Sequence, residues 1–424
     1  MNTDLSELSS SAGSHRVVLG HDWLTGMRGG EKVLQYFAGA FPSATIATLL
    51  ANPSALSPDL ASHPLCCSFL DRIPGIARRY RSFLPLMPLA ARSLRVPPAD
   101  LLLTTSHCVA KGFRKPRGSR HVCYCFTPMR YAWLFREEYL GRGLKSALAR
   151  PLLAYLRDWD KRASDNVDRF VAISHCVADR IRDFYGRDSD LVYPPVDTDF
   201  YTPSSATQPS SPVASPLCHA SPSEGIVASP LCHASPPKGA AACPLGATSL
   251  RGRAPAGRAP ASFDLVVSAL VPYKRIDLAV RAYTRANLPL KVVGTGTGTE
   301  RLKSLAGPTI EFLGWRTNEE IRELYRSCRM LVFPGEEDFG IVPLEAMACG
   351  RPVVAYARGG ALDTVADGIS GLFFSEQTED SLLDAVSRAA SIDWSPAAIR
   401  AHAETFGPSR FVSEMARVIQ SVLA

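Results

Sequence analysis

The sequence predicts an α/β protein made of two doubly wound parallel-sheet domains. Short apolar runs alternate with amphipathic helical segments over most of the 424 residues, the pattern typical of parallel sheets with crossover helices. Glycine-rich or polar loops follow several apolar runs, as at the carboxyl ends of such strands. The chain is long for one domain, and a proline-rich stretch interrupts it once. We therefore expect an N-terminal domain at 16–203 and a C-terminal domain at 262–407.

The composition is that of a globular protein outside the secretory pathway. The chain is 46% hydrophobic and 21% charged, which are ordinary values for a soluble enzyme. No apolar run is long enough for a membrane span, and residues 1–15 lack a secretory signal, so we expect this segment to be a disordered tail. The 11 cysteines are scattered through expected strands and helices and are interpreted as reduced thiols. A cytoplasmic location is expected.

The first unit of the N-terminal domain carries a glycine pair. An apolar strand at 17–20 precedes a loop that ends at Gly29-Gly30, and a helix is expected from about Glu31. Glycines at the head of a helix allow a bound anion to approach the backbone closely, although a tight connection alone would look the same. The spacing does not fit G-x-G-x-x-G, which argues against a nicotinamide cofactor.

The rest of this domain repeats the rhythm. A strand at 99–107 ends in His107, and a lone histidine after a strand is more often structural than catalytic. The further expected elements are a strand within 121–133 that turns at Thr127-Pro128, a helix at about 144–163, a strand at 168–174, a helix from about Ser174, and an extended Pro-Pro segment at 193–201.

Residues 77–96 mix basic and apolar side chains. Five arginines alternate with Tyr80, Phe83 and several leucines. Such a mixture suits an anionic lipid surface. A surface helix whose arginines extend their apolar stems along the protein would show the same pattern. Both interpretations remain open from the sequence alone.

Residues 204–261 differ from the rest of the chain. They are rich in proline, serine and alanine, and VASPLCHASP occurs twice, at 213–222 and 227–236. Such a segment cannot bury enough apolar surface to offset its ordering entropy, so we expect a disordered insertion at the domain boundary. Four basic residues and one acidic residue give this segment a net charge of +3, out of +7 for the whole chain. The remaining charge of the folded part gives no argument for nucleic-acid binding.

The C-terminal domain is more regular. Its expected elements are a strand at 263–270, a loop at 271–277, a helix at 278–286, strands at 290–294 and 309–315, a helix at 319–328, and an amphipathic C-terminal helix at about 408–423. The last helix has an apolar face that needs a surface to cover. Packing back on the N-terminal domain would provide one.

One βαβ unit at 329–360 carries the chemistry. A buried strand leads into the loop GEEDFG, a helix begins near Pro343, and a second buried strand follows Gly350. Glu337 lies in the loop and Glu345 in the first helical turn, seven residues apart. The free N–H groups of that turn can receive a phosphate. An isolated E-x7-E pattern would more often be a solvated loop and a favourable helix-dipole contact.

The wider stretch EDFGIVPLEAMACGRPVVA resembles the donor-site signature of retaining nucleotide-sugar glycosyltransferases of the GT-B type, group 1 or family 4. The resemblance also covers HDWLTGMRGGEKVL, SHCVAKG, YCFTPMRYAW, LVPYKRIDLAV and RGGALDTVADGISGLFF, and it is closest in kind to bacterial O-antigen and exopolysaccharide mannosyltransferases. It implies two Rossmann-like domains that face each other across a cleft, with the donor mainly on the C-terminal domain and the acceptor mainly on the N-terminal one.

The resemblance also implies a reaction and its residues. A hexose, by resemblance mannose from GDP-mannose, would pass to a lipid-linked or saccharide acceptor, with no metal and no cofactor besides the donor. Peripheral association with an anionic membrane face would follow. The implied catalytic residues are Glu337, Lys274 and His107. The implied donor-binding residues are Gly29, Gly30, Lys274, Arg275, Trp315, Glu337, Phe339, Gly340, Ile341, Val342 and Glu345.

Two positions depart from the family pattern. Ala269 stands where relatives have an arginine before the lysine, and Arg275 is a candidate to compensate. Phe126 stands where relatives often have a histidine, so His107 or His21 would have to substitute if that group is essential. These departures keep two alternatives open: a noncatalytic sugar-nucleotide-binding assembly subunit, and a sugar-nucleotide hydrolase or epimerase on the same fold.

Overall fold

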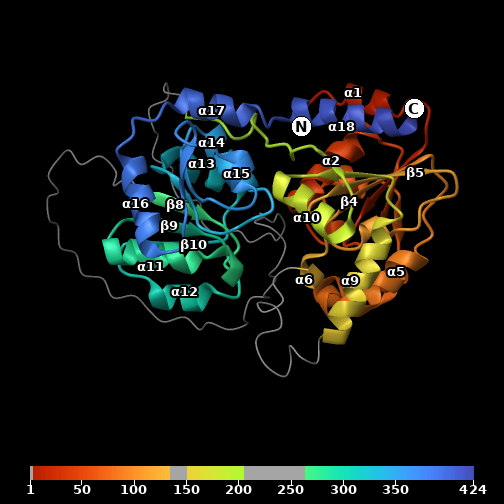
Figure 1. The fold of residues 1–424 in the computed structure, drawn as a ribbon, viewed down its shortest axis with the longest axis horizontal. Helices are drawn as coiled ribbons and strands as arrows, with labels where there is room; N and C mark the ends of the chain where they lie inside the picture. The colour runs from red at the N-terminus through yellow and green to blue at the C-terminus, as the bar shows by residue number, and fades with distance from the viewer. Residues whose placement is uncertain (1–2, 134–149, 205–262) are drawn as a thin grey trace, which may run out of the picture.

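The computed structural model describes residues 3–133, 150–204 and 263–424. The proline-rich insertion expected at 204–261 lies, apart from Ser204, outside the described residues. The beginning of the helix expected at 144–163 lies outside them too. Figure 1 shows the described chain as two bodies: one is coloured from red to yellow-green and also carries the blue final helix α18, Pro408–Leu423, and the other is coloured from green to blue.

The N-terminal domain is built on a seven-stranded parallel sheet in the order β3-β2-β1-β4-β5-β6-β7. The strands are β1 Val17–His21, β2 Thr45–Thr48, β3 Leu65–Cys67, β4 Leu101–Ser106, β5 Arg120–Cys125, β6 Arg169–Ala172 and β7 Ser189–Leu191. His21 pairs in register with Thr48 on one side and Thr105 on the other. The polar ends of three neighbouring strands therefore meet at the carboxyl edge of the sheet.

Helices cover both faces of this sheet. They are α2 Gly29–Ala40, α3 Pro58–Ala61, α4 Ile76–Arg79, α5 Met87–Ser93, α6 Arg130–Trp133, α9 Arg150–Ser164 and α10 His175–Tyr185, with 3-10 turns at Pro53–Ala55, Phe69–Arg72, Tyr80–Leu86 and Ala110–Gly112. The expected helix near Ser174 is α10: the Ser174 side chain caps it by accepting from the N–H of Val177 at 3.3 Å.

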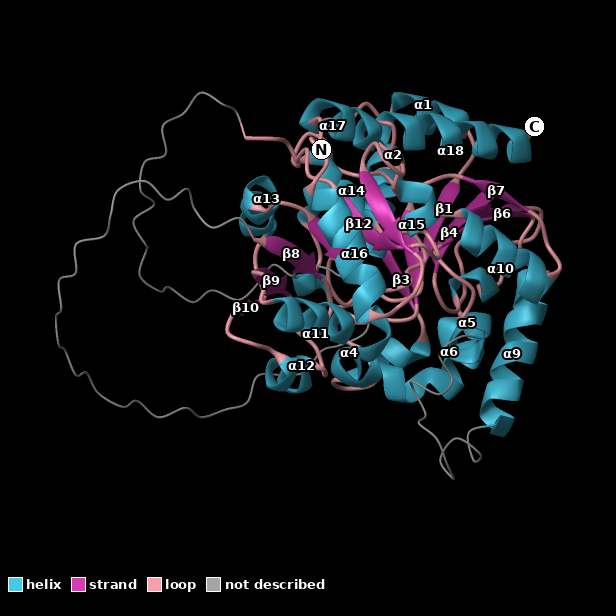
Figure 2. Ribbon diagram, turned by 60° about the vertical axis from the view of Figure 1, so that its left-hand side comes forward, coloured by secondary structure: helices cyan, strands magenta, loops and turns pink. Residues whose placement is uncertain are grey.

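The C-terminal domain is built on a six-stranded parallel sheet in the order β10-β9-β8-β11-β12-β13. The strands are β8 Asp264–Val267, β9 Leu290–Val293, β10 Ile310–Gly314, β11 Leu331–Phe333, β12 Val353–Tyr356 and β13 Gly371–Phe374. Its helices are α11 Ile276–Ala286, α12 Thr299–Leu305, α13 Asn318–Ser327, α14 Ile341–Ala348, α15 Ala361–Thr364, α16 Glu379–Ala390 and α17 Pro396–Glu404, with a 3-10 turn at Pro272–Lys274. The strands of both sheets are shown in magenta in Figure 2.

Each sheet has one point at which the strand order reverses. It lies between β1 and β4 in the first sheet and between β8 and β11 in the second. Open α/β sheets bind ligands beyond the strand ends at this point. The two loops that the sequence singles out, after β1 and after β11, both begin there. This confirms the α/β class with two Rossmann-like parallel sheets.

The two ends of the chain pack together. Helix α1, Ser6–Ser11, lies beside the final helix α18, Pro408–Leu423, in both views (Figures 1 and 2). The expectation of a disordered tail at 1–15 is therefore wrong for residues 3–15, and residues 1–2 lie outside the described residues. Leu8 is fully buried, and the apolar face of α18 supplies the surface that orders this short segment.

Helix α18 covers the N-terminal sheet although it follows the C-terminal domain in sequence. Phe411 is 1% exposed, and its ring lies within 5.7 Å, centroid to centroid, of the rings of Tyr36, Phe37 and Tyr124. The chain thus returns to its first domain and ties the two bodies together. Within the described ranges, no helix is both long and apolar enough to cross a bilayer.

Replacing Phe411 with alanine should reduce the free energy of unfolding by about 3–5 kcal/mol, because it removes a buried ring from an aromatic cluster. Denaturant unfolding followed by tryptophan fluorescence measures the change. Gln420→Ala, at an exposed position of the same helix, should shift stability by less than about 0.5 kcal/mol. Equal effects of the two substitutions would show that α18 does not anchor the first domain.

Candidate active site

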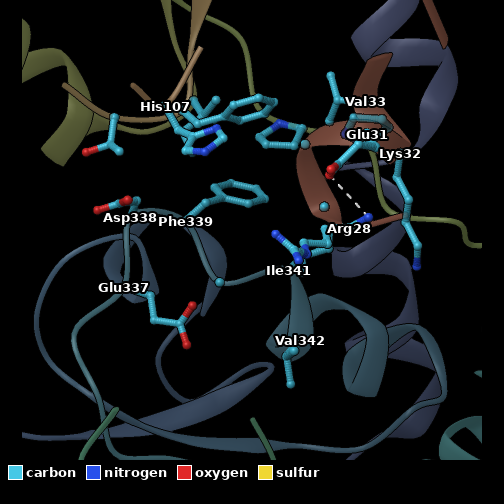
Figure 3. Close-up of a pocket in the computed structure, with 18 of the residues that line it drawn as sticks. Arg28, Glu31, Lys32, Val33, His107, Glu337, Asp338, Phe339, Ile341 and Val342 are labelled. Atoms are coloured by element: carbon cyan, nitrogen blue, oxygen red, sulfur yellow. Dashed lines mark hydrogen bonds between the residues drawn. The ribbon is translucent and has the colours of Figure 1, made fainter. Parts of the chain in front are cut away.

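A pocket lies between the two domains. The N-terminal wall comes from the loop after β1, the start of α2 and the loops after β4 and β5; the C-terminal wall comes from residues 337–345. Figure 3 shows Arg28, Glu31 and Lys32 on one side and Glu337, Asp338 and Phe339 on the other. The cleft therefore brings together the strand ends at which both sheets reverse their order.

The amino end of α14 forms part of the C-terminal wall. Gly340 precedes the helix with a φ of 93°, a left-handed conformation that glycine adopts without strain. Ile341 and Val342 then begin the helix and line the pocket. Because the first N–H groups of a helix have no partner within it, this end can accept an anion.

Glu345 lies one turn into α14 and is 9% exposed. Its carboxylate accepts a hydrogen bond from the Tyr325 hydroxyl at 3.0 Å, and Tyr201 also donates to it. Burial raises the pKa of Glu345, while the nearby Lys32 and the two tyrosines act in the opposite direction. The carboxylate is thus fixed in place and reaches the pocket as a hydrogen-bond acceptor.

Lys274 and Glu337 form an ion pair behind the pocket wall. Lys274 is 2% exposed, and burial lowers its pKa although Glu337 favours the charged form. Glu337 lines the pocket itself. Two residues 63 positions apart in sequence thus form one ion pair, in which each side chain compensates the charge of the other.

The glycine pair opens α2 on the facing wall. A Cβ at Gly30 would lie 3.2 Å from both the His21 and Phe126 rings, so a larger residue would press on them. Gly29 and Gly30 both line the pocket. The backbone at this turn is therefore exposed to whatever occupies the cleft.

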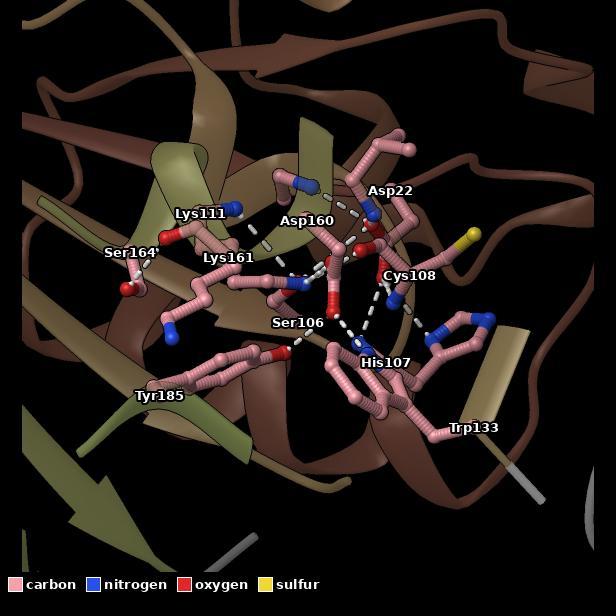
Figure 4. Close-up of polar contacts among 12 residues, drawn as sticks. Asp22, Ser106, His107, Cys108, Lys111, Trp133, Asp160, Lys161, Ser164 and Tyr185 are labelled. Atoms are coloured by element: carbon pink, nitrogen blue, oxygen red, sulfur yellow. Dashed lines mark hydrogen bonds and ion pairs between the residues drawn. The ribbon is translucent and has the colours of Figure 1, made fainter. Parts of the chain in front are cut away.

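His107 is held by a buried carboxylate. The Asp22 carboxylate accepts hydrogen bonds from the backbone N–H groups of 107–110 at 2.5–3.0 Å and lies 3.0 Å from Nδ1 of His107 (Figure 4). Burial alone would raise the pKa of Asp22, but His107 and these bonds hold it below its usual range. Nε2 of His107 has no hydrogen-bond partner among the described residues, and the ring lines the pocket.

Glu31 is a second buried carboxyl on the N-terminal wall. It is 3% exposed, and its Oε2 accepts from the backbone N–H of Arg28 at 3.2 Å (Figure 3). Burial raises the pKa of Glu31 to about 7, although the Arg28 charge opposes the shift. A carboxyl with such a pKa exchanges its proton near neutral pH, unlike an ordinary glutamate.

Polar contacts between the domains surround the pocket. The Asp338 carboxylate pairs with both Arg130 and Arg180 of the N-terminal domain. A second acidic residue, Asp363, pairs with His175 and accepts from the Tyr193 hydroxyl at 2.9 Å. These contacts hold the loop 336–340 against the first domain.

The pocket contains most of the site residues that the sequence predicts. Those that line it are Gly29, Gly30, His107, Glu337, Phe339, Gly340, Ile341, Val342 and Glu345, and Lys274 reaches it through Glu337. Two do not line it. Arg275 has a φ of 53° and donates to Gln377 at 2.7 Å, and Trp315 follows the edge strand β10 and is 44% exposed.

Sequence reasoning missed several charged residues of the pocket. They are Arg28, Glu31, Lys32, Arg130 and Asp338, together with Asp22, which does not line the pocket but contacts His107. All of them lie within motifs that the resemblance covers, but their spacing in sequence gives no sign that they converge. Within the described residues, no three His, Cys, Asp or Glu side chains converge as a metal-binding group.

Two protein families match successive parts of the chain. The family described as Glycosyltransferase Family 4 matches residues 27–200, and Glycosyl transferases group 1 matches residues 261–405. The first match covers the domain with the glycine turn, and the second covers the domain with Lys274, Glu337 and Glu345.

Individual relatives match shorter stretches. D-inositol 3-phosphate glycosyltransferase of Stackebrandtia nassauensis is 37% identical over 28% of this chain and 31% of its own length, and its namesake in Streptomyces griseus is 30% identical over 42% and 45%. An uncharacterized glycosyltransferase of Methanocaldococcus jannaschii is 32% identical over 30% and 37%. The chain thus covers less than half the length of each of these curated relatives.

Solved structures share the fold along nearly the whole chain. Anabaena HepE in complex with UDP superposes with a TM-score of 0.61 at 16% identity, covering 96% of this chain and 99% of that one. Sucrose-phosphate synthase of Thermosynechococcus elongatus gives 0.57 at 15% identity, covering 96% of each. The chain thus joins a Glycosyltransferase Family 4 part, residues 27–200, to a Glycosyl transferases group 1 part, residues 261–405, and its two-domain architecture is the GT-B fold.

Proposed function

We propose that the protein is a retaining glycosyltransferase that moves a hexose from a nucleotide sugar to a lipid-linked or saccharide acceptor in cell-surface polysaccharide synthesis. The observation that carries the proposal is the pocket between the domains, where the amino end of α14, Glu337 and Glu345 face the Gly29-Gly30 turn. Mannose from GDP-mannose is the first donor to test, because of the mannosyltransferase resemblance. UDP in the Anabaena HepE structure supports a nucleotide-sugar donor in general.

The donor wall fits the charge that this reaction develops. Cleavage of the anomeric C–O bond leaves an oxocarbenium-like sugar and a nucleoside diphosphate with growing negative charge. In this proposal the N–H groups at the start of α14 receive that charge, together with the Lys274 ammonium, which lies behind Glu337. Glu337 would bind sugar hydroxyls and Glu345 the ribose. The proposal assigns these roles without a metal ion.

The N-terminal wall fits a sugar acceptor. Aromatic and polar groups alternate there, and the edge of the His107 ring meets Trp23 at 4.6 Å between centroids. The acceptor hydroxyl forms the new bond to the anomeric carbon, and its proton leaves with the departing phosphate oxygen or through His107. Asp22 fixes the ring through Nδ1, and Nε2 is a buried nitrogen with no hydrogen-bond partner among the described residues, so it would have to be uncovered for that contact.

A noncatalytic role is the second candidate, favoured by one observation. Phe126 occupies the pocket where relatives often carry a histidine, and its ring packs against the position of Gly30. A phenyl ring can neither donate nor accept a proton. Nucleotide-sugar binding without turnover on any acceptor would select this alternative, and nucleotide release that ignores the acceptor would indicate a hydrolase.

Residues 76–93 form the candidate membrane contact. They fold as α4, a 3-10 turn and α5, which leave Leu86 and Leu89 exposed at 44% and 56% beside the exposed Arg78, Arg79 and Arg92. Arg81, which the sequence groups with them, is half-buried. An acceptor carried on a lipid would place the enzyme at such a surface.

Lys274→Ala and Glu345→Ala should each weaken donor binding severalfold and lower turnover, because they remove a diphosphate cation and a ribose acceptor. A thermal-shift panel of sugar nucleotides measures binding, since a ligand of the native state raises stability by mass action. Lys303→Ala, at an exposed lysine of α12, is the control and should bind as the unsubstituted protein does. If both site variants keep their affinity and rate, the donor site lies elsewhere.

Glu31→Gln should alter the pH dependence of stability. With a folded-state pKa of about 7 and an ordinary unfolded one, the unsubstituted protein loses unfolding free energy as pH rises from about 4.5 to 7. The glutamine keeps an acceptor for the Arg28 N–H and cannot ionise. The unfolding free energy of the variant, relative to that of the unsubstituted protein, should therefore rise by about 2–3 kcal/mol from pH 5 to pH 8. Denaturant unfolding across this range measures the difference.

The control for this measurement is Glu300→Gln, at an exposed position of α12. It should leave the pH profile of stability unchanged. Parallel profiles for Glu31→Gln and the unsubstituted protein would show that Glu31 is ionised throughout this range.

The triple variant Arg78→Glu, Arg79→Glu and Arg92→Glu should abolish binding to anionic vesicles. Each cation near an anionic surface contributes about 1 kcal/mol, so three reversals are a large change. Sedimentation with vesicles of anionic or neutral lipid at low salt measures it. We expect the unsubstituted protein to bind the anionic vesicles and not the neutral ones.

A second triple variant gives the matched control. It makes the same change of charge at exposed positions of the C-terminal domain: Arg301, Lys303 and Arg388. It should retain vesicle binding. Loss of binding in both variants would mean that net charge, and not this patch, is responsible.

A further inference from the structure

We propose that Arg130, from the N-terminal domain, is a ligand of the donor diphosphate and leaves Asp338 to bind it. The inference rests on the proposed function and names an additional binding residue in the same site. It follows from the charge balance of the pocket, from the position of Arg130 beside Lys274, and from a second arginine that remains with Asp338.

The charge balance leaves the diphosphate short of cations. A nucleoside diphosphate brings about two negative charges into a cleft whose Lys274 is already paired with Glu337. On the same wall, Glu345 and Asp338 add further carboxylates. The start of α14 supplies N–H donors and only a partial positive charge.

On the facing wall, the Arg28 charge acts on Glu31 and the Lys32 charge acts on Glu345. Arg130 instead shares its carboxylate with Arg180, so it is the lining cation that can turn to the ligand and leave its partner compensated.

Arg130 is placed to supply that cation. It begins α6, just after Thr127-Pro128, and lines the pocket. Its guanidinium carbon lies 5.8 Å from the centroid of the Tyr273 ring, and the Lys274 ammonium lies 5.4 Å from the same centroid. The two cations thus flank one ring, and the Arg130 charge is among the influences that lower the pKa of Lys274.

Asp338 does not depend on Arg130 alone. Its carboxylate also pairs with Arg180, which reaches Glu336 at 3.4 Å as well and does not line the pocket. When Arg130 turns toward a diphosphate, Asp338 keeps one guanidinium and remains compensated. A planar guanidinium can bind phosphate oxygens through two parallel hydrogen bonds, which a lysine cannot do.

The two arginines provide a matched pair of variants. Arg130→Ala and Arg180→Ala each remove one partner of Asp338, but only the first removes a cation that lines the pocket. The probes are UDP, GDP, ADP and dTDP, each compared with its own nucleoside by calorimetry. Melting temperatures of both variants verify that they fold.

We expect Arg130→Ala to lower the affinity for whichever diphosphate binds by about tenfold or more, as expected for loss of a charged hydrogen bond. The affinity for the matching nucleoside should change by less than about twofold. Arg180→Ala should leave the ratio of diphosphate to nucleoside affinity unchanged. Arg130→Lys, which keeps the charge without the planar fork, should recover part of the loss.

The outcomes separate this inference from the proposed function. If the unsubstituted protein binds none of the four diphosphates, the proposed function fails and this inference fails with it. The other case is that the unsubstituted protein binds a diphosphate but Arg130→Ala leaves the ratio of diphosphate to nucleoside affinity unchanged, or Arg130→Ala and Arg180→Ala lower that ratio equally. The proposed donor site is then supported. Arg130 then acts only through Asp338, and the inference is overturned.

Discussion

The carboxylate of Asp338 is the contact on which the arrangement of the cleft depends. It belongs to the loop that carries Glu337, yet its partners Arg130 and Arg180 come from the other domain. Burial would raise its pKa, but the two guanidinium groups hold it below the usual range, so the carboxylate stays charged. Removing one partner of a buried pair of this kind typically costs about 3–5 kcal/mol. Asp338 thus ties the loop that carries Glu337 to two side chains of the other domain.

Other charged side chains around the pocket are paired in the same way. Lys274 is paired with Glu337, and His107 with Asp22. In each pair a buried or partly buried charge faces a group that compensates it, which lowers the cost of keeping these side chains away from water.

The termini extend this coupling to the whole molecule. Helix α18 follows the C-terminal domain but packs on the first sheet through Phe411, with α1 beside it. The two bodies are thus joined at the cleft by polar contacts and at the far side by an apolar one. The polar contacts depend on charge and direction, whereas the apolar contact depends on buried area.

The sequence by itself determined the parallel α/β elements and most of the donor wall, because strands, helix starts and the E-x7-E spacing are local patterns that a few neighbouring residues fix. It was wrong at residues 3–15, where a surface on α18 orders α1. Arg275 and Trp315 lie outside the pocket lining, in directions that depend on a left-handed turn and an edge strand, and their donor-binding roles stay predictions. Only the tertiary structure decided that Arg130 and Arg180 meet Asp338 and that Asp22 fixes His107. Those partners lie 85 to more than 200 residues apart, and nothing in a local pattern records a contact at that separation.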